Sequence, residues 1–265
     1  MDQSAGEDQR DRVDRASAFA GGAPAAARKF TAKGLATRNR IIAAAAGLVF
    51  ARGVARTGME DIQRQAGVSA SQMYHYFTDK DDLVRAVIAH QTDGILDAQR
   101  PVLDELDSFD ALERWRDLLV GLQEQRNCVG GCPIGSIAAE LADDHPRARA
   151  DLVDAFERWE APIRAGLARM RARGDLRPDT DTDALALALL VALQGGLLLT
   201  QTRRDTAPLR TGLDVVLTHI RTYATERTQR RDRTRASMPS SPTRRTTAVD
   251  APARTAPAEP PAPST

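Results

Sequence analysis

The sequence is poor in aromatic residues and cysteine, and neither sign of charge is in excess. Aromatic side chains make up 4% of the 265 residues, there are 2 cysteines, and the formal net charge is +1. So few aromatic and alternating β-branched residues leave little material for a β-sheet. The C-x-x-x-C spacing, without a recognisable secretory signal, indicates reduced thiols rather than a disulfide framework. We therefore expect an all-α, cytoplasmic protein.

Long hydrophobic runs are also missing. The most apolar stretch, residues 184–199, is interrupted by Gln194 and two glycines, and it is shorter than the roughly 20 residues that a membrane-spanning helix needs. With 42% apolar residues, the chain still has enough material for a hydrophobic core. The sequence predicts a soluble protein that does not enter a membrane.

Motifs of catalysis and metal binding are absent from the sequence. It contains neither G-x-S-x-G nor a phosphate-binding glycine loop. The four histidines lie far apart and at no spacing typical of metal ligands: His75, His90, His145 and His219. We predict no catalytic residues, no metal, no cofactor and no enzymatic activity.

A helix-turn-helix pattern occupies residues 59–77. Its first helix, expected over Met59–Ala66, places Ile62 on an apolar face. Gly67 follows at the position where a left-handed backbone ends a helix. Ser69 then begins a second helix, with Gln72 at the spacing of a capping box. The pattern predicts two short helices joined by a tight turn.

The second helix has one apolar and one polar face. Met73 and Phe77, four residues apart, are expected to point into the core. The residues left outside form a small polar and aromatic surface that suits a DNA major groove: Ala70, Ser71, Gln72, Tyr74 and His75. Further helices are expected over residues 37–52 and from 79 to about 99.

Positive charge is concentrated just before this motif. Between Arg28 and Met59 there is no acidic residue, and the basic residues there are Arg28, Lys29, Lys33, Arg38, Arg40, Arg52 and Arg56. Such clustering is typical of a surface that binds nucleic acid, even where the total charge is near zero.

The order of these residues resembles the DNA-binding domain of TetR-family transcriptional regulators. The resemblance covers about residues 36–91 without a gap and rests on I-I-A-A-A (41–45), G-L-V-F-A-R-G (47–53), D-I (61–62), A-G-V-S (66–69), Y-H-Y-F (74–77) and D-K-D-D-L (79–83). It implies a homodimer, usually a repressor, on a near-palindromic double-stranded operator. It also implies a C-terminal helical domain that binds a small molecule and thereby releases the DNA.

The resemblance also implies roles for single residues. By position, Ser71, Gln72 and Tyr74 would contact base edges, while Thr57, His75 and Lys80 would contact phosphates. The full DNA-binding set that it implies is Arg38, Thr57, Ser69, Ala70, Ser71, Gln72, Tyr74, His75 and Lys80. Gly58 departs from the family pattern, which often has a hydroxyl residue there, so the resemblance does not carry over that phosphate contact.

The composition divides the chain into four parts. We expect a disordered arm over residues 1–33, the DNA-binding domain over 34–91, a helical ligand-binding and dimerisation domain over 92–226, and a disordered tail over 227–265. The basic residues of the arm either contact DNA, as basic arms do in other folds, or form a solvated leader. The basic tail either adds non-specific DNA affinity or, as the favoured interpretation, is a plain solvated extension.

The second domain is expected to contain helices over residues 111–125, 134–141, 146–173, 182–203 and 208–224. Pro162 lies inside the third of these and predicts a kink or a break. The helix over 182–203 is apolar almost all round and must be covered on every side. Pairing it with the last helix predicts a four-helix dimer interface that includes Leu190, Leu197, Leu198, Leu213 and Leu217.

The same domain supplies a set of apolar side chains for a ligand cavity. They are Trp115, Leu118, Leu122, Ile134, Ile137, Phe156, Trp159, Ile163 and Met170. A cavity lined by them would favour a small hydrophobic or aromatic effector. The alternative for the two tryptophans is a place in the core.

The stretch G-C-P-I-G-S-I-A (131–138) resembles a branch of TetR-like regulators that includes LmrA, some of which respond to drugs or aromatic compounds. Cys128 and Cys132 flank two glycines, and small residues at a tight turn explain them. The alternative is a thiol redox-sensing transcriptional regulator that uses these two cysteines.

Overall fold

The computed structural model describes residues 30–230, and this range is helical, with one isolated β-bridge between Leu176 and Ala224. The predicted all-α class is confirmed. The helices are α2 (Ala32–Arg52), α3 (Met59–Ala66), α4 (Ala70–Tyr76), α5 (Lys80–Asp97), the 3-10 helix η2 (Val102–Glu105), α6 (Phe109–Gln125), α7 (Pro133–Leu141), α8 (Pro146–Ala172), α9 (Thr182–Arg203) and α10 (Ala207–Arg221).

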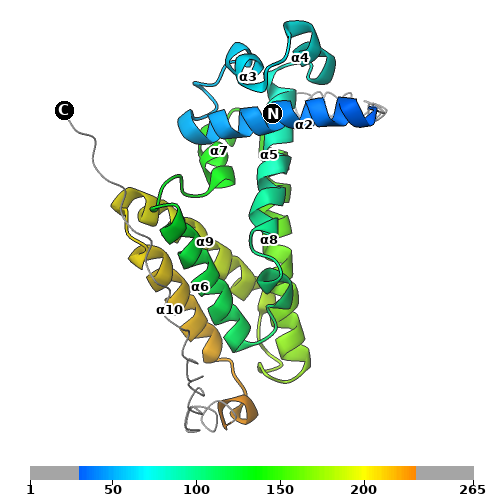
Figure 1. Cartoon of the computed structure of the whole chain (residues 1–265). Helices are drawn as coiled ribbons and strands as arrows, with labels where there is room; N and C mark the ends of the chain where they lie inside the picture. The colour runs from blue at the N-terminus through cyan, green and yellow to red at the C-terminus, as the bar shows by residue number, and fades with distance from the viewer. Residues whose placement is uncertain (1–29, 231–265) are drawn as a thin grey trace, which may run out of the picture.

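The helices form two units that share α5 (Figure 1). Helices α2, α3 and α4 make the head, in which α2 crosses α5 near its beginning. Helices α6 to α10 make the body, in which α8 packs along α5 and α9 packs against both α8 and α10. Helix α5 continues past residue 91, where the sequence predicts a domain boundary, and so belongs to both units.

Side-chain caps set where several helices begin. The Thr31 hydroxyl accepts a hydrogen bond from the Gly34 amide at 3.2 Å, so α2 begins at Ala32 rather than at Thr37. Residues 32 and 33, expected in the disordered arm, are therefore helical, and at the other end residues 227–230 of the expected tail are helical as well. The rest of the arm (1–29) and of the tail (231–265) lies outside the described residues.

Helix α8 runs without interruption through Pro162. The proline has no amide to donate to the carbonyl of Arg158, which is why the sequence predicts a kink or a break. The prediction of a break is wrong, because the face of α8 on both sides of the proline is held in the core by Trp159, Ile163 and Leu167, each at most 3% exposed. Tertiary packing offsets the lost hydrogen bond.

Helix α9 is the one helix in residues 30–230 that is long and apolar enough to cross a membrane. In this structure its inner face, which includes Leu189 and Leu193, is fully buried against α8 and α10. A core helix of a folded domain has the same length and composition.

Helix α8 approaches the segment before α6 closely at Gly166, because a Cβ placed there would lie 1.7 Å from the carbonyl oxygen of Leu106. We expect Gly166→Ala to lower the free energy of unfolding by about 1–3 kcal/mol, since the added methyl must push backbone apart. Gly121→Ala in α6 is the matched control: its Cβ would meet nothing within 4 Å, and loss of a helical glycine stabilises by about 0.5–1 kcal/mol. Urea denaturation measures both, and equal stability of the two variants would contradict the close approach.

Candidate nucleic-acid interface

The turn between α3 and α4 has the geometry that the sequence predicts. Gly67 is left-handed, with φ 61° and ψ 45°. Its amide donates to the Arg64 carbonyl at 3.2 Å, and the Val68 amide donates to the Gln63 carbonyl at 3.2 Å. These bonds occupy carbonyls that the end of α3 would otherwise leave free, and they fix the direction in which α4 leaves.

A capping box fixes the beginning of α4. The Ser69 hydroxyl accepts from the Gln72 amide at 3.2 Å, and the Gln72 side-chain oxygen accepts from the Ser69 amide at 3.0 Å. The predicted S-x-x-Q box is therefore confirmed. Because its Oε1 is engaged in this box, Gln72 keeps only its Nε2 group as a donor toward DNA.

Helix α4 buries one face and exposes the other. Met73 on the helix and Phe77 just after it are each 1% exposed and anchor α4 to the core of the head. On the opposite side Ser71 is exposed, and Tyr74 has 60% of its surface accessible. A rigid helix thus presents a hydroxyl and a phenol to solvent, both able to donate and accept hydrogen bonds.

The segment before α2 packs against the end of α4, a contact that the sequence analysis missed. The ring centroid of Phe30 lies 5.2 Å from that of Tyr76 and 6.2 Å from that of His75. The rings of His75 and Tyr76 meet edge to face at 4.9 Å. This cluster holds the exit of the N-terminal arm beside the exposed face of α4. No local pattern indicates it, because Phe30 is far from α4 in sequence.

Helix α3 begins without a side-chain cap from its first position, since Gly58 has no side chain. Asp61 takes that role: its Oδ2 accepts from the Gly58 amide at 3.3 Å and from Arg52 at 2.6 Å, and its Oδ1 pairs with Arg64. The backbone hydrogen bond from Gly58 and the two arginine charges hold the pKa of Asp61 below its usual value. The carboxylate therefore joins the end of α2 to the beginning of α3.

Three residues of the implied DNA-binding set face the protein in this conformation. Thr57 is 1% exposed and its hydroxyl donates to the Gly53 carbonyl at 2.7 Å, so its side chain is not available to a phosphate. The Lys80 ammonium donates to the Val54 carbonyl at 2.7 Å. The Arg38 guanidinium lies over the Phe77 ring, 5.2 Å from its centroid. The Thr57 amide is also engaged, since it donates to the Val54 carbonyl at 3.1 Å, so the implied Thr57 contact needs a rearrangement of the loop.

Two protein-family models match the chain in the ranges that these units occupy. Residues 41–87 match the model described as "Bacterial regulatory proteins, tetR family", and residues 109–216 match "Tetracyclin repressor-like, C-terminal domain". The chain belongs to the TetR family of transcriptional regulators. The predicted family is thereby confirmed, whereas the LmrA-like branch stays a prediction.

Similar proteins of known name are regulators of the same kind. An uncharacterized HTH-type transcriptional regulator of Mycobacterium tuberculosis is 27% identical over 179 residues, which are 65% of this chain and 88% of the relative. The HTH-type transcriptional regulator TtgR of Pseudomonas putida is 28% identical over 169 residues, 60% of this chain and 77% of the relative. The crystal structure of a TetR transcriptional regulator from Chloroflexus aurantiacus superposes with a TM-score of 0.62 at 27% identity, covering 73% of this chain and 98% of that one.

Most of the residues predicted to line a ligand cavity lie in the core of this TetR-family body. A small cavity of about 40 Å³ lies between α5, α6, α8 and α9, and Leu122 and Trp159 are the predicted residues that line it. Trp115 is fully buried, and its indole N–H donates to Gln99 Oε1 at 2.8 Å, as that of Trp159 does at 3.1 Å. The sequence analysis missed Gln99, a polar residue in the turn after α5, because its role depends on two tryptophans 16 and 60 residues further along the chain.

The predicted dimer-interface residues need a correction. Leu190, Leu197, Leu213 and Leu217 are at most 6% exposed within a single chain, so they pack inside the protomer and cannot form a surface for a second one. Leu198 is 63% exposed. It belongs to an outward-facing apolar stripe on α9 and α10, which we call the α9–α10 stripe: Leu187, Val191, Leu198, Leu199 and Val215.

The two cysteines are buried and lie in the turn before α7. Cys132 is the N-terminal cap of α7, and its Sγ accepts from the Gly135 amide at 3.3 Å. Burial raises the pKa of the Cys132 thiol, opposed in part by that hydrogen bond. Because the thiolate is the reactive form, this environment disfavours thiol chemistry and favours the structural explanation of the C-x-x-x-C pattern.

Proposed function

We propose that this chain is a cytoplasmic transcriptional repressor that binds a near-palindromic operator as a homodimer, without enzymatic activity. The exposed face of α4 carries the proposal, because a capping box and two buried anchors hold it rigidly toward solvent. Ser71, Tyr74 and the Nε2 group of Gln72 contact base edges in the major groove. Ser69, Ala70 and His75 position the DNA backbone. Lys80 and Arg38 join them once they leave the Val54 carbonyl and the Phe77 ring that they contact in this conformation.

The homodimer forms through the α9–α10 stripe. A two-fold axis places the same stripe of each chain against its partner, so one apolar surface covers the other. It also places two copies of α4 about 34 Å apart or a multiple of that distance, which matches successive major grooves on one side of the duplex. The operator is therefore expected to be a near-palindrome.

A small aromatic or hydrophobic effector enters the body beside Trp159 and releases the DNA. The cavity there is about 40 Å³, so the effector must widen it. Gln123 lines the cavity, is 5% exposed, and its Oε1 has no hydrogen-bond partner within residues 30–230. Since a buried acceptor without a partner is costly, an effector that carries a hydroxyl or N–H group satisfies it. A phenol-like compound combines an aromatic, largely apolar ring with such a hydroxyl group.

Selection of bound sequences from random DNA tests the proposed function directly. The expected product is one near-palindromic sequence, bound by a dimer in a gel-shift assay. Recovery of unrelated sequences without a common motif would contradict sequence-specific regulation.

A panel of phenols then tests the effector. A compound that releases the operator is expected to change tryptophan emission, because Trp159 lines the cavity and the chain has only 2 tryptophans. In Trp159→Phe, where Trp115 alone emits, most of that change is expected to be lost while release persists. Release with unchanged emission in the wild-type chain would place the effector elsewhere. Release by oxidant that is lost in Cys132→Ser would favour the thiol switch.

A further inference from the structure

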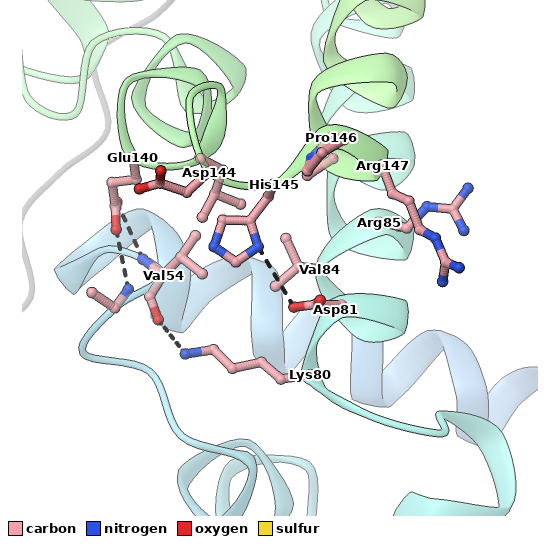
Figure 2. A pocket seen from close by; sticks show the side chains of 13 residues that line it. Val54, Lys80, Asp81, Val84, Arg85, Glu140, Asp144, His145, Pro146 and Arg147 are labelled. Carbon is pink, nitrogen blue, oxygen red and sulfur yellow. Dashed lines mark hydrogen bonds and ion pairs between the residues drawn. The ribbon is translucent and has the colours of Figure 1, made fainter. Parts of the chain in front are cut away.

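Cavities between the head and the body differ in the charges that line them. One of about 540 Å³ lies between the loop after α2, the beginning of α5 and the turn before α8. Its lining mixes both signs (Figure 2), among them Lys80, Asp81, Glu140 and Arg147, so it selects neither an anion nor a cation. An open groove of about 490 Å³ elsewhere on this boundary is lined by a single charged side chain.

This groove, which we call the α2 groove, is formed by the head and the body together. Helix α2 contributes Gly47 and Phe50, and the segment between α6 and α7 contributes Arg126, Val129 and Pro133. Phe50 is 40% exposed and Val129 is 49% exposed, so both units present apolar surface to solvent there. Covering this surface with an apolar compound removes it from water, which is favourable.

The α2 groove leads to the small cavity beside Trp159. Arg126 and Pro133 line both spaces, so they form the boundary between the open groove and the interior. The inner cavity, at about 40 Å³, is much smaller than the roughly 300 Å³ or more in which small molecules usually bind. A ligand that lies in the groove and inserts only its tip needs less widening of the core than one that enters completely.

The charge at this boundary is positive. Among the residues that the structure describes, Arg126 is the one charged residue that lines the groove or the inner cavity. Its side chain is exposed and forms no ion pair with any residue between 30 and 230. A guanidinium is always protonated in proteins and binds a carboxylate through two parallel hydrogen bonds. The boundary therefore favours an anion over a neutral or cationic group.

The inner end of the site requires a hydrogen-bond donor. Gln123 is 5% exposed and borders the inner cavity, and its Oε1 accepts from no donor in residues 30–230. The other glutamine there is engaged already, because Gln99 Oε1 accepts from both tryptophans and its Nε2 donates to the Ile95 carbonyl at 3.0 Å. A hydroxyl group that reaches Gln123 supplies the hydrogen bond that this buried oxygen lacks.

We propose that the effector is an aromatic monocarboxylate with a hydroxyl group at the opposite end of its ring, bound across the α2 groove and the inner cavity. The hydroxyl donates to Gln123 Oε1, the ring lies beside Pro133 and Val129, and the carboxylate stays in the groove, where Arg126 binds it. This inference rests on the proposed function and adds the charge of the effector and the residue that selects it.

The same position brings the effector into contact with the head. Phe50 belongs to α2, and its ring lies so close to Gly130 that a Cβ there would be 1.9 Å from the ring Cζ. Gly130 and Gly131 both have positive φ, 91° and 56°, and Gly131 lines the inner cavity. A ligand in the groove displaces the Phe50 ring or this glycine segment, and so changes how α2 rests on the body.

Calorimetric titration of the full chain without DNA tests the site. The probe is para-hydroxyphenylpropanoate. Its primary amide is the neutral control, tyramine is the cationic control, and phenylpropanoate lacks the hydroxyl. The acid is expected to bind about tenfold more tightly than the amide, the effect of one charge-assisted contact, and about tenfold more tightly than phenylpropanoate. An amide or tyramine that binds as tightly as the acid would overturn the proposal.

Two substitutions are expected to have crossed effects on these affinities. Arg126→Gln removes the preference for the acid over the amide and keeps the preference for the hydroxyl, whereas Gln123→Leu does the reverse. A damaged fold weakens all probes alike and does not produce this pattern. Arg114→Gln is the matched control, because Arg114 is exposed on α6 and borders neither space. Equal loss in Arg114→Gln and Arg126→Gln would show a general charge effect and overturn the assignment.

Filling the groove gives an independent result. Gly47 and Gly94 are both exposed helical glycines at which a Cβ would meet nothing within 4 Å, and Gly47 alone of the two lines the groove. Gly47→Leu is expected to lose binding of the acid, whereas Gly94→Leu is expected to keep it. Full binding of the acid in both variants would exclude the groove.

Addition of the acid to the operator complex separates this inference from the proposed function. The acid is expected to release the operator at about one tenth of the concentration that the amide requires. Equal release by both compounds would overturn the role of the carboxylate and leave a phenol effector in place. Binding of the acid without any release would overturn its role as effector. A chain that binds the acid through Arg126 but prefers no DNA sequence would refute only the proposed function.

Discussion

Tyr74→Ala is expected to remove most of the preference for the operator while leaving the fold intact. Tyr74 is 60% exposed, so its truncation leaves no cavity in the core. A good base contact is worth about 1–3 kcal/mol of discrimination, and a dimer loses it twice. The ratio of the dissociation constant for a scrambled duplex of equal length to that for the operator is therefore expected to fall by about thirtyfold to about twenty-thousandfold.

Tyr74→Phe separates the phenol hydroxyl from the ring. If the hydroxyl contacts a base edge, Tyr74→Phe also loses most of the operator preference. If instead the ring packs on a thymine methyl group, Tyr74→Phe keeps that preference. Thermal unfolding of both variants is expected to match that of the wild-type chain. An operator preference that survives in Tyr74→Ala would place the base-reading surface outside α4.

Val191→Glu combined with Leu198→Glu is expected to give a monomer. These side chains are each 63% exposed in the single chain, so the protomer tolerates a charge there. In the proposed dimer each glutamate would be buried without a partner, at a cost of about 3–5 kcal/mol per uncompensated charge. Sedimentation is expected to show the mass of one chain, and operator affinity is expected to collapse because one head reads only half a site.

Val153→Glu is the control for that experiment. Val153 is 51% exposed on α8, outside the α9–α10 stripe, so its charge is expected to leave the dimer and the operator affinity unchanged. Leu197→Glu is unsuitable as a test, because Leu197 is 4% exposed and its replacement would damage the protomer core. A dimer that persists in the double variant would remove the α9–α10 stripe from the proposal.

The elements that the sequence predicts well are those whose signals are local. The left-handed turn at Gly67 and the Ser69–Gln72 box are decided within four residues, and both occur as predicted. The ends of α3 and α9 agree with the helical patterns for the same reason. The beginning of α2 was missed because the periodic pattern starts later than the Thr31 cap.

What the sequence does not reveal depends on contacts between distant segments. Helix α9 is apolar almost all round, so its periodicity does not distinguish Leu197, which is buried, from Leu198, which is exposed. The packing of α8 and α10 decides between them. Likewise the hydrogen bonds from the Val54 and Ala55 amides to Glu140 join residues 86 and 85 positions apart, and Thr57 is withdrawn from the surface by a fold-dependent bond to Gly53.

The Glu140 carboxylate accepts hydrogen bonds from the main-chain amides of Val54 and Ala55 and so attaches the body to the head without using side chains of the head. Every residue except proline supplies such an amide. Substitutions at positions 54 and 55 therefore keep both hydrogen bonds as long as the loop keeps its path. This attachment therefore does not depend on the side chains at positions 54 and 55. A chimaera that joins this body to another family member's head would keep these two hydrogen bonds with a loop of the same length and shape opposite residue 140 and no proline at those two positions.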